Sequence, residues 1–139
     1  MSAAPQDEIH RGRCACGAVS YVLRGPLRPV VFCHCESCRR QSGHIVSATS
    51  VPLDRLSVTG AENLGDWQAT PDAVRQFCKV CGSHLFWRGH DATSISVMAG
   101  SLDTPTGLTP WGHIFVAEKG DYYEISDGLP QYDGRPPRD

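Results

Sequence analysis

The spacing of seven cysteines constrains this chain more than any other feature of its sequence. They form a C-x-C pair, a C-x-C-x-x-C triplet and a C-x-x-C-G pair, which are Cys14 and Cys16; Cys33, Cys35 and Cys38; and Cys78 and Cys81. Two pairs supply four thiolates, the number that closes a tetrahedral structural zinc site, whereas three thiolates leave one position open, as in catalytic zinc sites. The count therefore predicts one zinc ion that holds the fold and one that takes part in chemistry.

Disulfide bonds explain these cysteines less well than metal binding. The cysteine count is odd, and neighbouring C-x-C thiols bridge poorly because a disulfide demands a specific geometry. Disulfide scaffolds are typical of secreted chains, yet the segment Met1–Arg13 is polar and lacks the apolar region of a signal peptide. A thioredoxin-like pair at Cys78 and Cys81 would leave the other cysteines unexplained. We therefore expect thiols in a reducing cytoplasm.

Spacing alone leaves open which cysteines share an ion. Cys16-Gly17 and Cys81-Gly82 both fit a knuckle, in which backbone N–H groups turn toward the thiolates and glycine supplies a positive φ. Joining the first and last pairs would clip together two halves of a small β structure. A zinc ribbon that pairs the second cluster with the last is an equally good alternative, built from Cys35, Cys38, Cys78 and Cys81 with Cys14, Cys16 and Cys33 left over.

Composition and charge narrow the function classes. The chain has 139 residues, of which 40% are hydrophobic and 20% charged, as expected of an ordinary globular domain. A formal net charge of −2 gives no general attraction for nucleic acid or an anionic membrane. Arg39-Arg40 is the only tight basic pair away from the tails, and no apolar run reaches the ~20 residues of a membrane span. We expect neither a nucleic-acid nor a membrane partner.

The pattern of short segments predicts an all-β fold with very little helix. The 14 glycines and 10 prolines divide the chain into short pieces rich in β-branched and aromatic residues. The expected strands are Ala18–Leu23, Val30–Phe32, Ile45–Val51, Leu56–Thr59, Val74–Phe77, His84–Trp87, Ser94–Met98, His113–Val116 and Asp121–Ile125. Only Glu36–Ser42 fits a helical turn.

The motifs around the cysteines resemble those of a known family. The order G-R-C-A-C-G-A-V-S-Y, C-H-C-E-S-C-R-R-Q-S-G and F-C-K-V-C-G-S-H-L-F is similar to that of the glutathione-dependent formaldehyde-activating enzyme family, which includes centromere protein V. The C-terminal part matches as well, at Gly100–Asp103, Pro110–Ile114, Lys119 and Tyr122. The resemblance extends from Gly12 to Asp133.

The resemblance implies a fold and a division of the cysteines. It implies a β-tent of packed antiparallel sheets, shared with Rab-accessory zinc proteins and B-type methionine sulfoxide reductases. The domain would span residues 12–133 between flexible tails at 1–11 and 134–139. The implied structural zinc is held by Cys14, Cys16, Cys78 and Cys81, and the implied catalytic zinc by Cys33, Cys35 and Cys38.

The resemblance also implies a reaction. Members condense glutathione with formaldehyde to S-hydroxymethylglutathione, a step classed with the carbon–sulfur lyases, so the expected partners are a glutathione-like thiol and an aldehyde. Three thiolates make zinc a weak Lewis acid, so we favour binding of the substrate thiol as thiolate at the open position. Arg39 and Arg40 are the nearest cations for the carboxylates of glutathione. The oligomeric state stays open.

Several histidines could modify this picture. His34 lies between two expected ligands, but the middle side chain of an extended C-x-C points away from the metal, so we expect no ligation. His84 and His113 lie in strand patterns and are expected to be structural, whereas His44 follows the triplet closely enough to carry a proton.

Two other functions fit the same fold. A zinc-stabilised binding module would have the triplet empty or closed. A methionine sulfoxide reductase would need a reactive free cysteine apart from paired zinc motifs, and the clusters here are arranged differently.

Overall fold

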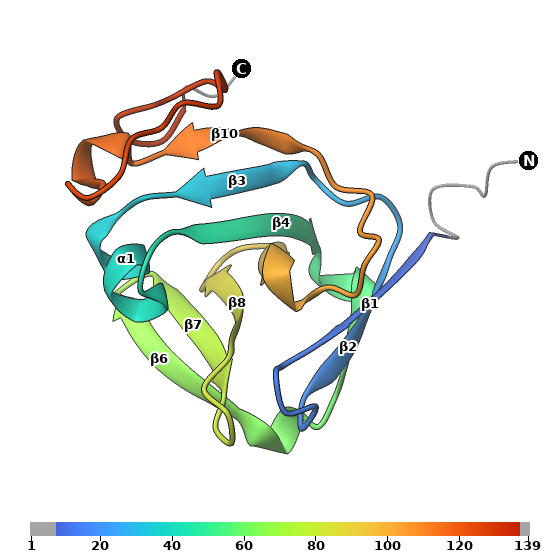
Figure 1. Ribbon diagram of the computed structural model, residues 1–139. Coiled ribbons are helices and arrows are strands. Elements are labelled where there is room, and N and C mark those ends of the chain that lie inside the picture. Colours follow the sequence, from blue (N-terminus) through green and yellow to red (C-terminus); the bar gives the residue numbers. More distant parts are fainter. Residues whose placement is uncertain (1–7, 137–139) are drawn as a thin grey trace, which may run out of the picture. The chain divides into compact units, whose positions relative to one another are not determined.

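The computed structural model describes residues 8–136, which are predominantly β-strands with one α-helix (Figure 1). The described chain divides into two compact units; the single domain over residues 12–133 that the resemblance implies stays a prediction. The first unit holds the residues up to Arg28 and Thr49–Gly107, and the second holds Pro29–Ala48 and the residues from Leu108 onward. The chain passes from the second unit back to the first within strand β4 (Val46–Pro52), since one boundary falls after Ala48.

The first unit contains one three-stranded sheet and one antiparallel meander. The sheet has the order β1-β2-β5, and both of its pairings are antiparallel. These strands are β1 (Ile9–Arg13), β2 (Ser20–Arg24) and β5 (Leu56–Thr59). The meander runs through β6 (Leu64–Thr70), β7 (Ala73–Cys78), β8 (His84–Gly89) and β9 (Ser94–Met98), each antiparallel to the next.

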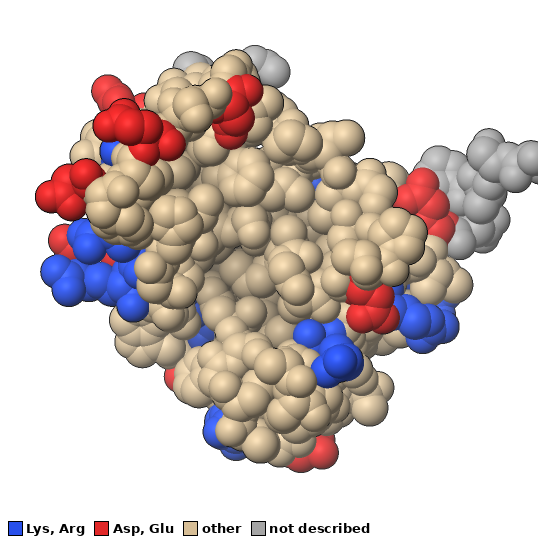
Figure 2. All heavy atoms as spheres, in the orientation of Figure 1, with Lys and Arg blue, Asp and Glu red and all other residues tan. Residues whose placement is uncertain are grey.

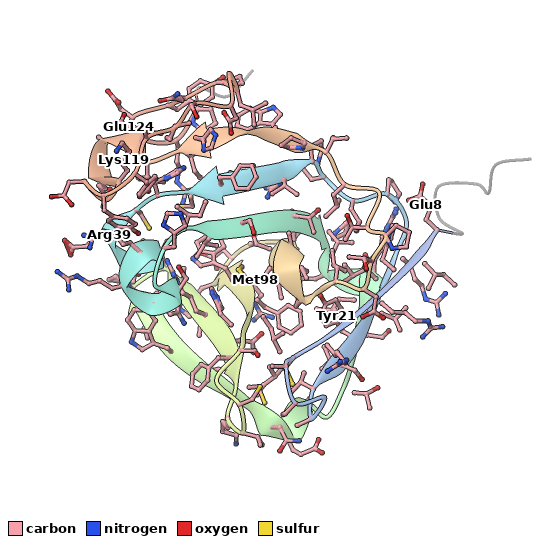
Figure 3. All side chains as sticks on the ribbon, viewed as in Figure 1. Glu8, Tyr21, Arg39, Met98, Lys119 and Glu124 are labelled. Carbon is pink, nitrogen blue, oxygen red and sulfur yellow. The ribbon has the colours of Figure 1, made fainter. Side chains whose placement is uncertain are left out.

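Alternation along β2 fills the core of the first unit. Tyr21 and Leu23 are buried while their neighbours are less so, as expected when side chains alternate between the two faces of a strand. The ring of Tyr21 meets the fully buried ring of Phe86 edge to face, at 5.3 Å between centroids. Its hydroxyl lies 2.5 Å from Ser101 Oγ, which in turn donates to the carbonyl of Met98 (Figure 3). Burial raises the pKa of Tyr21 to about 12, so this core hydroxyl stays protonated.

The second unit contains one mixed set of strands and the helix. Strand β3 (Val30–Cys33) pairs antiparallel with the first part of β4 (Val46–Pro52) and parallel with β10 (Pro110–Ile114). Helix α1 (Glu36–Ser42) follows β3; its N-cap is Cys35 and its C-cap is Gly43, which has a φ of 89° and donates its N–H to the carbonyl of Arg39.

Four short 3-10 helices complete the part of the fold formed by residues 8–136. They are η2 (Leu53–Arg55), η3 (Ala61–Asn63), η4 (Ala99–Ser101) and η5 (Val116–Glu118).

The predicted fold class is confirmed, and most predicted strands lie within a few residues of observed ones. The helical turn over Glu36–Ser42 is confirmed at both ends. The strand predicted over Asp121–Ile125 is wrong, because this segment curves around Lys119, whose Nζ donates to the carbonyls of Gly120 and Tyr123. Strand β6 went unpredicted, since its sequence LGDWQAT is polar and half exposed.

One boundary and one strand pairing also differ from what the resemblance implies. Strand β1 begins at Ile9, inside the segment 1–11 that the resemblance implies is a flexible tail, because Ile9 pairs with Arg24. Residues 1–7 and 137–139 of the two predicted tails lie outside the described residues. The β10–β3 pair is parallel, whereas the resemblance implies packed antiparallel sheets.

Across residues 8–136 we find no helix with the length and apolar character needed to cross a lipid bilayer.

Candidate metal centres and their surroundings

The first unit brings two knuckles together into a cluster of four cysteine sulfurs. Cys14 and Cys16 follow β1, Cys78 ends β7, and Cys81 lies in the turn before β8. All four sulfur atoms lie within 4.8 Å of one another, with 3.7 Å between Cys14 and Cys16 and 3.8 Å between Cys16 and Cys78. Four Zn–S bonds of about 2.3 Å at tetrahedral angles place sulfurs about 3.8 Å apart. The donor set therefore fits a tetrahedral zinc ion.

Backbone N–H groups at both turns point at these sulfurs. The N–H of Val19 lies 3.3 Å from Cys14 Sγ, and the N–H of Val80 lies 3.4 Å from Cys78 Sγ. Gly17 and Gly82 have φ angles of 82° and 83°, which an L side chain rarely adopts. Donors of this kind stabilise thiolates and orient metal ligands.

Ser83 connects the two knuckles. Its Oγ accepts a hydrogen bond from the N–H of Ala15 at 3.0 Å and lies 3.2 Å from Cys81 Sγ. Hydrogen bonds from the hydroxyl and then from the N–H of Ser83 are the main causes that lower the pKa of Cys81 to about 5. Cys81 is thus predisposed to the thiolate form that a metal requires.

The second unit brings the three remaining cysteines together where β3 meets α1. Cys33 ends β3, Cys35 is the helix N-cap and Cys38 lies buried in the first turn. The three sulfurs lie within 4.8 Å of one another; Cys35 Sγ is 2.9 Å from Cys38 Sγ and accepts from the N–H of Cys38.

Crowding changes the acidity of this triplet. The pKa of Cys33 is raised, chiefly by its hydrogen bond to Cys35, then by that to Cys38 and by burial. Three thiols held this closely cannot all ionise without a compensating positive charge. The donor set therefore fits a cation that prefers sulfur, such as zinc, with three protein ligands.

His34 is held by the protein at both ring nitrogens. It is 1% exposed, and its Nε2 lies 2.8 Å from His113 Nδ1 while its Nδ1 lies 2.6 Å from the hydroxyl of Tyr123. Burial, followed by the influence of His113, lowers the pKa of His34 to about 4. Because neither nitrogen is available to a metal, the triplet keeps three protein ligands among the described residues.

His113 extends this network toward the surface. Its Nε2 lies 2.8 Å from Asp127 Oδ2, and its ring stacks on Phe32 at 5.2 Å between centroids. The other carboxylate oxygen of Asp127 accepts the N–H of Leu129 at 3.0 Å. This N–H, and then the bond to His113, lower the pKa of Asp127, so the carboxylate is ionised at neutral pH.

An aromatic cluster lies on the other side of His34. His44 Nδ1 is 2.8 Å from the hydroxyl of Tyr122, and the rings of His44 and Tyr123 meet edge to face at 4.6 Å. Lys119 Nζ lies 4.8 Å from the centroid of the Tyr123 ring. Burial is the main cause that raises the pKa of Tyr123. His44, predicted to be a proton carrier, is exposed and bonded to tyrosine.

The two arginines of the candidate thiol-binding site have different surroundings. Arg40 is 71% exposed and forms an ion pair with Glu36 one helical turn earlier, at 3.6 Å. Arg39 has a buried Nε without a hydrogen-bond partner in the described part of the chain. Figure 3 shows Arg39 on the same side of the second unit as Lys119, and Figure 2 shows basic side chains gathered over α1 beside acidic ones.

Sequence reasoning did not identify Ser83, Tyr123 or Asp127. Ser83 could have been found from its place two residues after Cys81, since groups near a metal ligand often hydrogen-bond to it and orient it. Tyr123 and Asp127 give no such signal, because they come from an irregular segment roughly ninety residues beyond the triplet they approach.

Comparison with known proteins places the chain in a family. A family model described as glutathione-dependent formaldehyde-activating enzyme matches residues 9–118. A Schizosaccharomyces pombe protein described as an uncharacterized lyase is 32% identical over 80 residues, which is 56% of each chain, so the match spans about half the length of that relative. A crystal structure of a Rhodobacter sphaeroides protein superposes with a TM-score of 0.59 at 30% identity, covering 73% of this chain and 98% of that one.

The family match includes both cysteine clusters, and it covers most of the residues from which the two candidate centres are built. The chain therefore belongs to the glutathione-dependent formaldehyde-activating enzyme family.

Proposed function

We propose that this protein is a zinc-dependent carbon–sulfur lyase-type enzyme that joins a glutathione-like thiol to formaldehyde. The reaction forms one bond between the thiol sulfur and the aldehyde carbon, and the thiol proton ends on the former carbonyl oxygen, so no redox partner is needed. The observation that carries the proposal is the triplet of Cys33, Cys35 and Cys38, whose neighbour His34 is engaged elsewhere and leaves a coordination position for substrate.

Each protein group has a distinct part in this proposal. Zinc bound by the triplet would supply a positive charge that favours the substrate thiol as thiolate at neutral pH. Cys35 and Cys38 present their sulfurs from one helical turn, and the N–H of Cys38 holds Cys35 Sγ in place. The four-cysteine cluster would hold a second zinc ion, whose binding would stabilise the first unit.

Arg39 is the stronger of the two candidates for a substrate carboxylate. A buried guanidinium N–H that lacks a partner is costly unless a ligand supplies an acceptor. A carboxylate of a glutathione-like thiol would satisfy it with a charge-assisted hydrogen bond. Arg40 already faces Glu36 and solvent.

The first test is Cys35→Ser. We expect the rate of S-hydroxymethylglutathione formation to fall about 100-fold or more, because the triplet loses one of its three ligands. Formation is followed by NMR with labelled formaldehyde, and zinc content is measured by native mass spectrometry. The matched control is Ser37→Ala in the same helix. An undiminished rate at unchanged zinc content in the four-cysteine site would refute the catalytic role of the triplet.

The second test compares Arg39→Met with Arg40→Met. We expect Arg39→Met to raise KM for the thiol about 10-fold or more with little change in kcat, as for the loss of a charged hydrogen bond. Arg40→Met should change KM less than about twofold. Equal effects in both variants would show that neither arginine binds a carboxylate specifically.

A further inference from the structure

Four side chains form a continuous hydrogen-bonded chain within the second unit. It runs from Asp127 through His113 and His34 to Tyr123, with successive heavy-atom distances of 2.8, 2.8 and 2.6 Å. The two imidazoles are 5% and 1% exposed, whereas the Asp127 side chain at the end of the chain is 45% exposed. The network thus joins a surface carboxylate to the residue in the middle of the C-x-C motif.

The chemistry of the four groups determines which atom donates and which accepts in each hydrogen bond of the network; we call this order the direction of the network. A carboxylate only accepts hydrogen bonds, so His113 Nε2 carries a hydrogen and donates it to Asp127. At a pH where the His113 ring carries one hydrogen, that hydrogen is on Nε2, so Nδ1 is bare and accepts from His34 Nε2–H. His34 Nδ1 is bare in turn and accepts the hydroxyl hydrogen of Tyr123. Both imidazoles are therefore in the Nε2–H form.

The direction originates at Asp127 because the other three groups can each donate or accept. An imidazole offers one donor and one acceptor and can exchange them, and a phenol hydroxyl can turn either way. Only the carboxylate has a fixed role. Its second oxygen is also committed, since Oδ1 accepts the N–H of Leu129.

We propose that Asp127 is a positioning residue of the three-cysteine site: through His113 it fixes the tautomer of His34 and turns the hydroxyl hydrogen of Tyr123 inward. His34 lies between Cys33 and Cys35, and its backbone N–H is already bound to the carbonyl of Ile114. Both ring nitrogens of His34 are also hydrogen-bonded. The end of β3, which presents the sulfurs of Cys33 and Cys35, is therefore fixed by a main-chain hydrogen bond and by two side-chain hydrogen bonds.

The Asp127→Asn variant gives the sharpest prediction. Asparagine has a single side-chain oxygen, which stays on the N–H of Leu129 and leaves the NH₂ group facing His113 Nε2. Since two donors cannot face each other, His113 Nε2 becomes an acceptor and its Nδ1 gains the hydrogen. His34 follows, so the whole network reverses and Tyr123 becomes an acceptor. In Asp127→Ala, no group fixes the direction and both tautomers are populated.

The experiment is imidazole ¹⁵N NMR of the zinc-loaded protein with labelled histidine at neutral pH. In the native protein, Nδ1 should be the bare nitrogen of both His34 and His113. Asp127→Asn should move the bare nitrogen to Nε2 in both rings, and Asp127→Ala should give mixed signals. The control Asp133→Asn, an exposed carboxylate of the same unit, should leave both rings unchanged. Tyr123→Phe should also leave them unchanged, because the direction does not originate there.

A native His113 with both nitrogens protonated, or native signals retained in both the Asn and the Ala variants of Asp127, would overturn the proposal. So would a change in both rings caused by Tyr123→Phe alone. The readout requires no substrate, so its failure is distinct from failure of the proposed function. The activity readout rests on that function: kcat should fall about 10- to 100-fold in Asp127→Asn with KM unchanged, and Asp133→Asn should stay within about twofold.

Discussion

At the scale of single residues, burial sets the behaviour of His84. Its Nε2 lies 3.1 Å from the carbonyl of Phe86, and its buried Nδ1 has no hydrogen-bond partner among the described residues. Burial, and then the positive charge of Arg75, lower the pKa of His84 to about 4. The folded protein therefore binds this proton less readily than the unfolded chain, whose histidine titrates near 6.5. The stability that His84 contributes is complete above about pH 6.5 and is lost as the pH falls toward 4.

The first prediction follows from this loss of stability at low pH. Replacing His84 by Gln should make the melting temperature fall less steeply between pH 6.5 and 4.5 than in the native protein, by a few °C over that interval. Calorimetry at matched zinc content measures the difference. The exposed His90, changed to Gln, serves as the control and should retain the native slope. Parallel curves for the native and His84 proteins would show that His84 is not responsible.

At the scale of elements, the two turns of the four-cysteine cluster depend on each other. Ser83 directly precedes β8. Its Oγ accepts a hydrogen bond from the N–H of Ala15, which follows β1, and also contacts the sulfur of Cys81. Removing its hydroxyl removes the group that contributes most to the low pKa of Cys81 and leaves the N–H of Ala15 without this acceptor. The cluster should then hold its metal less firmly, since hydrogen-bonding partners of metal ligands typically contribute about 10- to 100-fold in affinity.

The second prediction is that Ser83→Ala accelerates removal of one zinc by a chelator about 10-fold or more. Release is followed with a colorimetric zinc indicator. Ser94→Ala, an exposed serine of the same unit in β9, is the matched control and should release zinc at the native rate. Accelerated release in both variants would point to a general loss of stability instead.

At the scale of the whole molecule, the two cysteine clusters belong to different compact units. A ligand lost from one cluster should therefore leave the other able to bind its ion. We predict that native mass spectrometry finds two zinc ions per chain, one in Cys33→Ser and one in Cys81→Ser. Cys81→Ser should lower the melting temperature far more, because the binding free energy of a structural zinc is folding free energy. Loss of both ions in either single variant would contradict independent sites.

The same measurement separates the enzyme from a binding module. Addition of glutathione to the native protein should produce a complex that carries two zinc ions and one tripeptide. Cys33→Ser should lose the tripeptide along with its zinc, while keeping the other ion. A native protein with a single zinc and no bound thiol would favour a module that acts through a protein partner.

The local sequence was sufficient for the parts of the fold that depend on neighbouring residues. The C-x-C and C-x-x-C spacings predict metal binding because two thiols this near in sequence can reach one ion where the chain turns, and the structure brings these cysteines together as four and three. The helical turn over Glu36–Ser42 was predicted from its local sequence, and the structure ends it at Gly43, which has a positive φ. Strands β5 (LSVT) and β9 (SISVM) were predictable because they are short segments in which apolar residues, several of them β-branched, alternate with serine or threonine.

Only the tertiary structure decided how distant segments meet. The spacing of the cysteines did not choose between a partition of four and three and a zinc ribbon. Cys16 and Cys78 are 62 residues apart in the sequence, and they meet because the β1–β2 turn and the β7–β8 turn belong to the same compact unit. The pairing of His34 with His113, Tyr123 and Asp127 had no local signal, since it depends on a parallel β10 beside β3 and on a curved C-terminal segment. Ligand chemistry is thus encoded by neighbours in sequence, whereas the groups that orient the ligands are supplied by long-range packing.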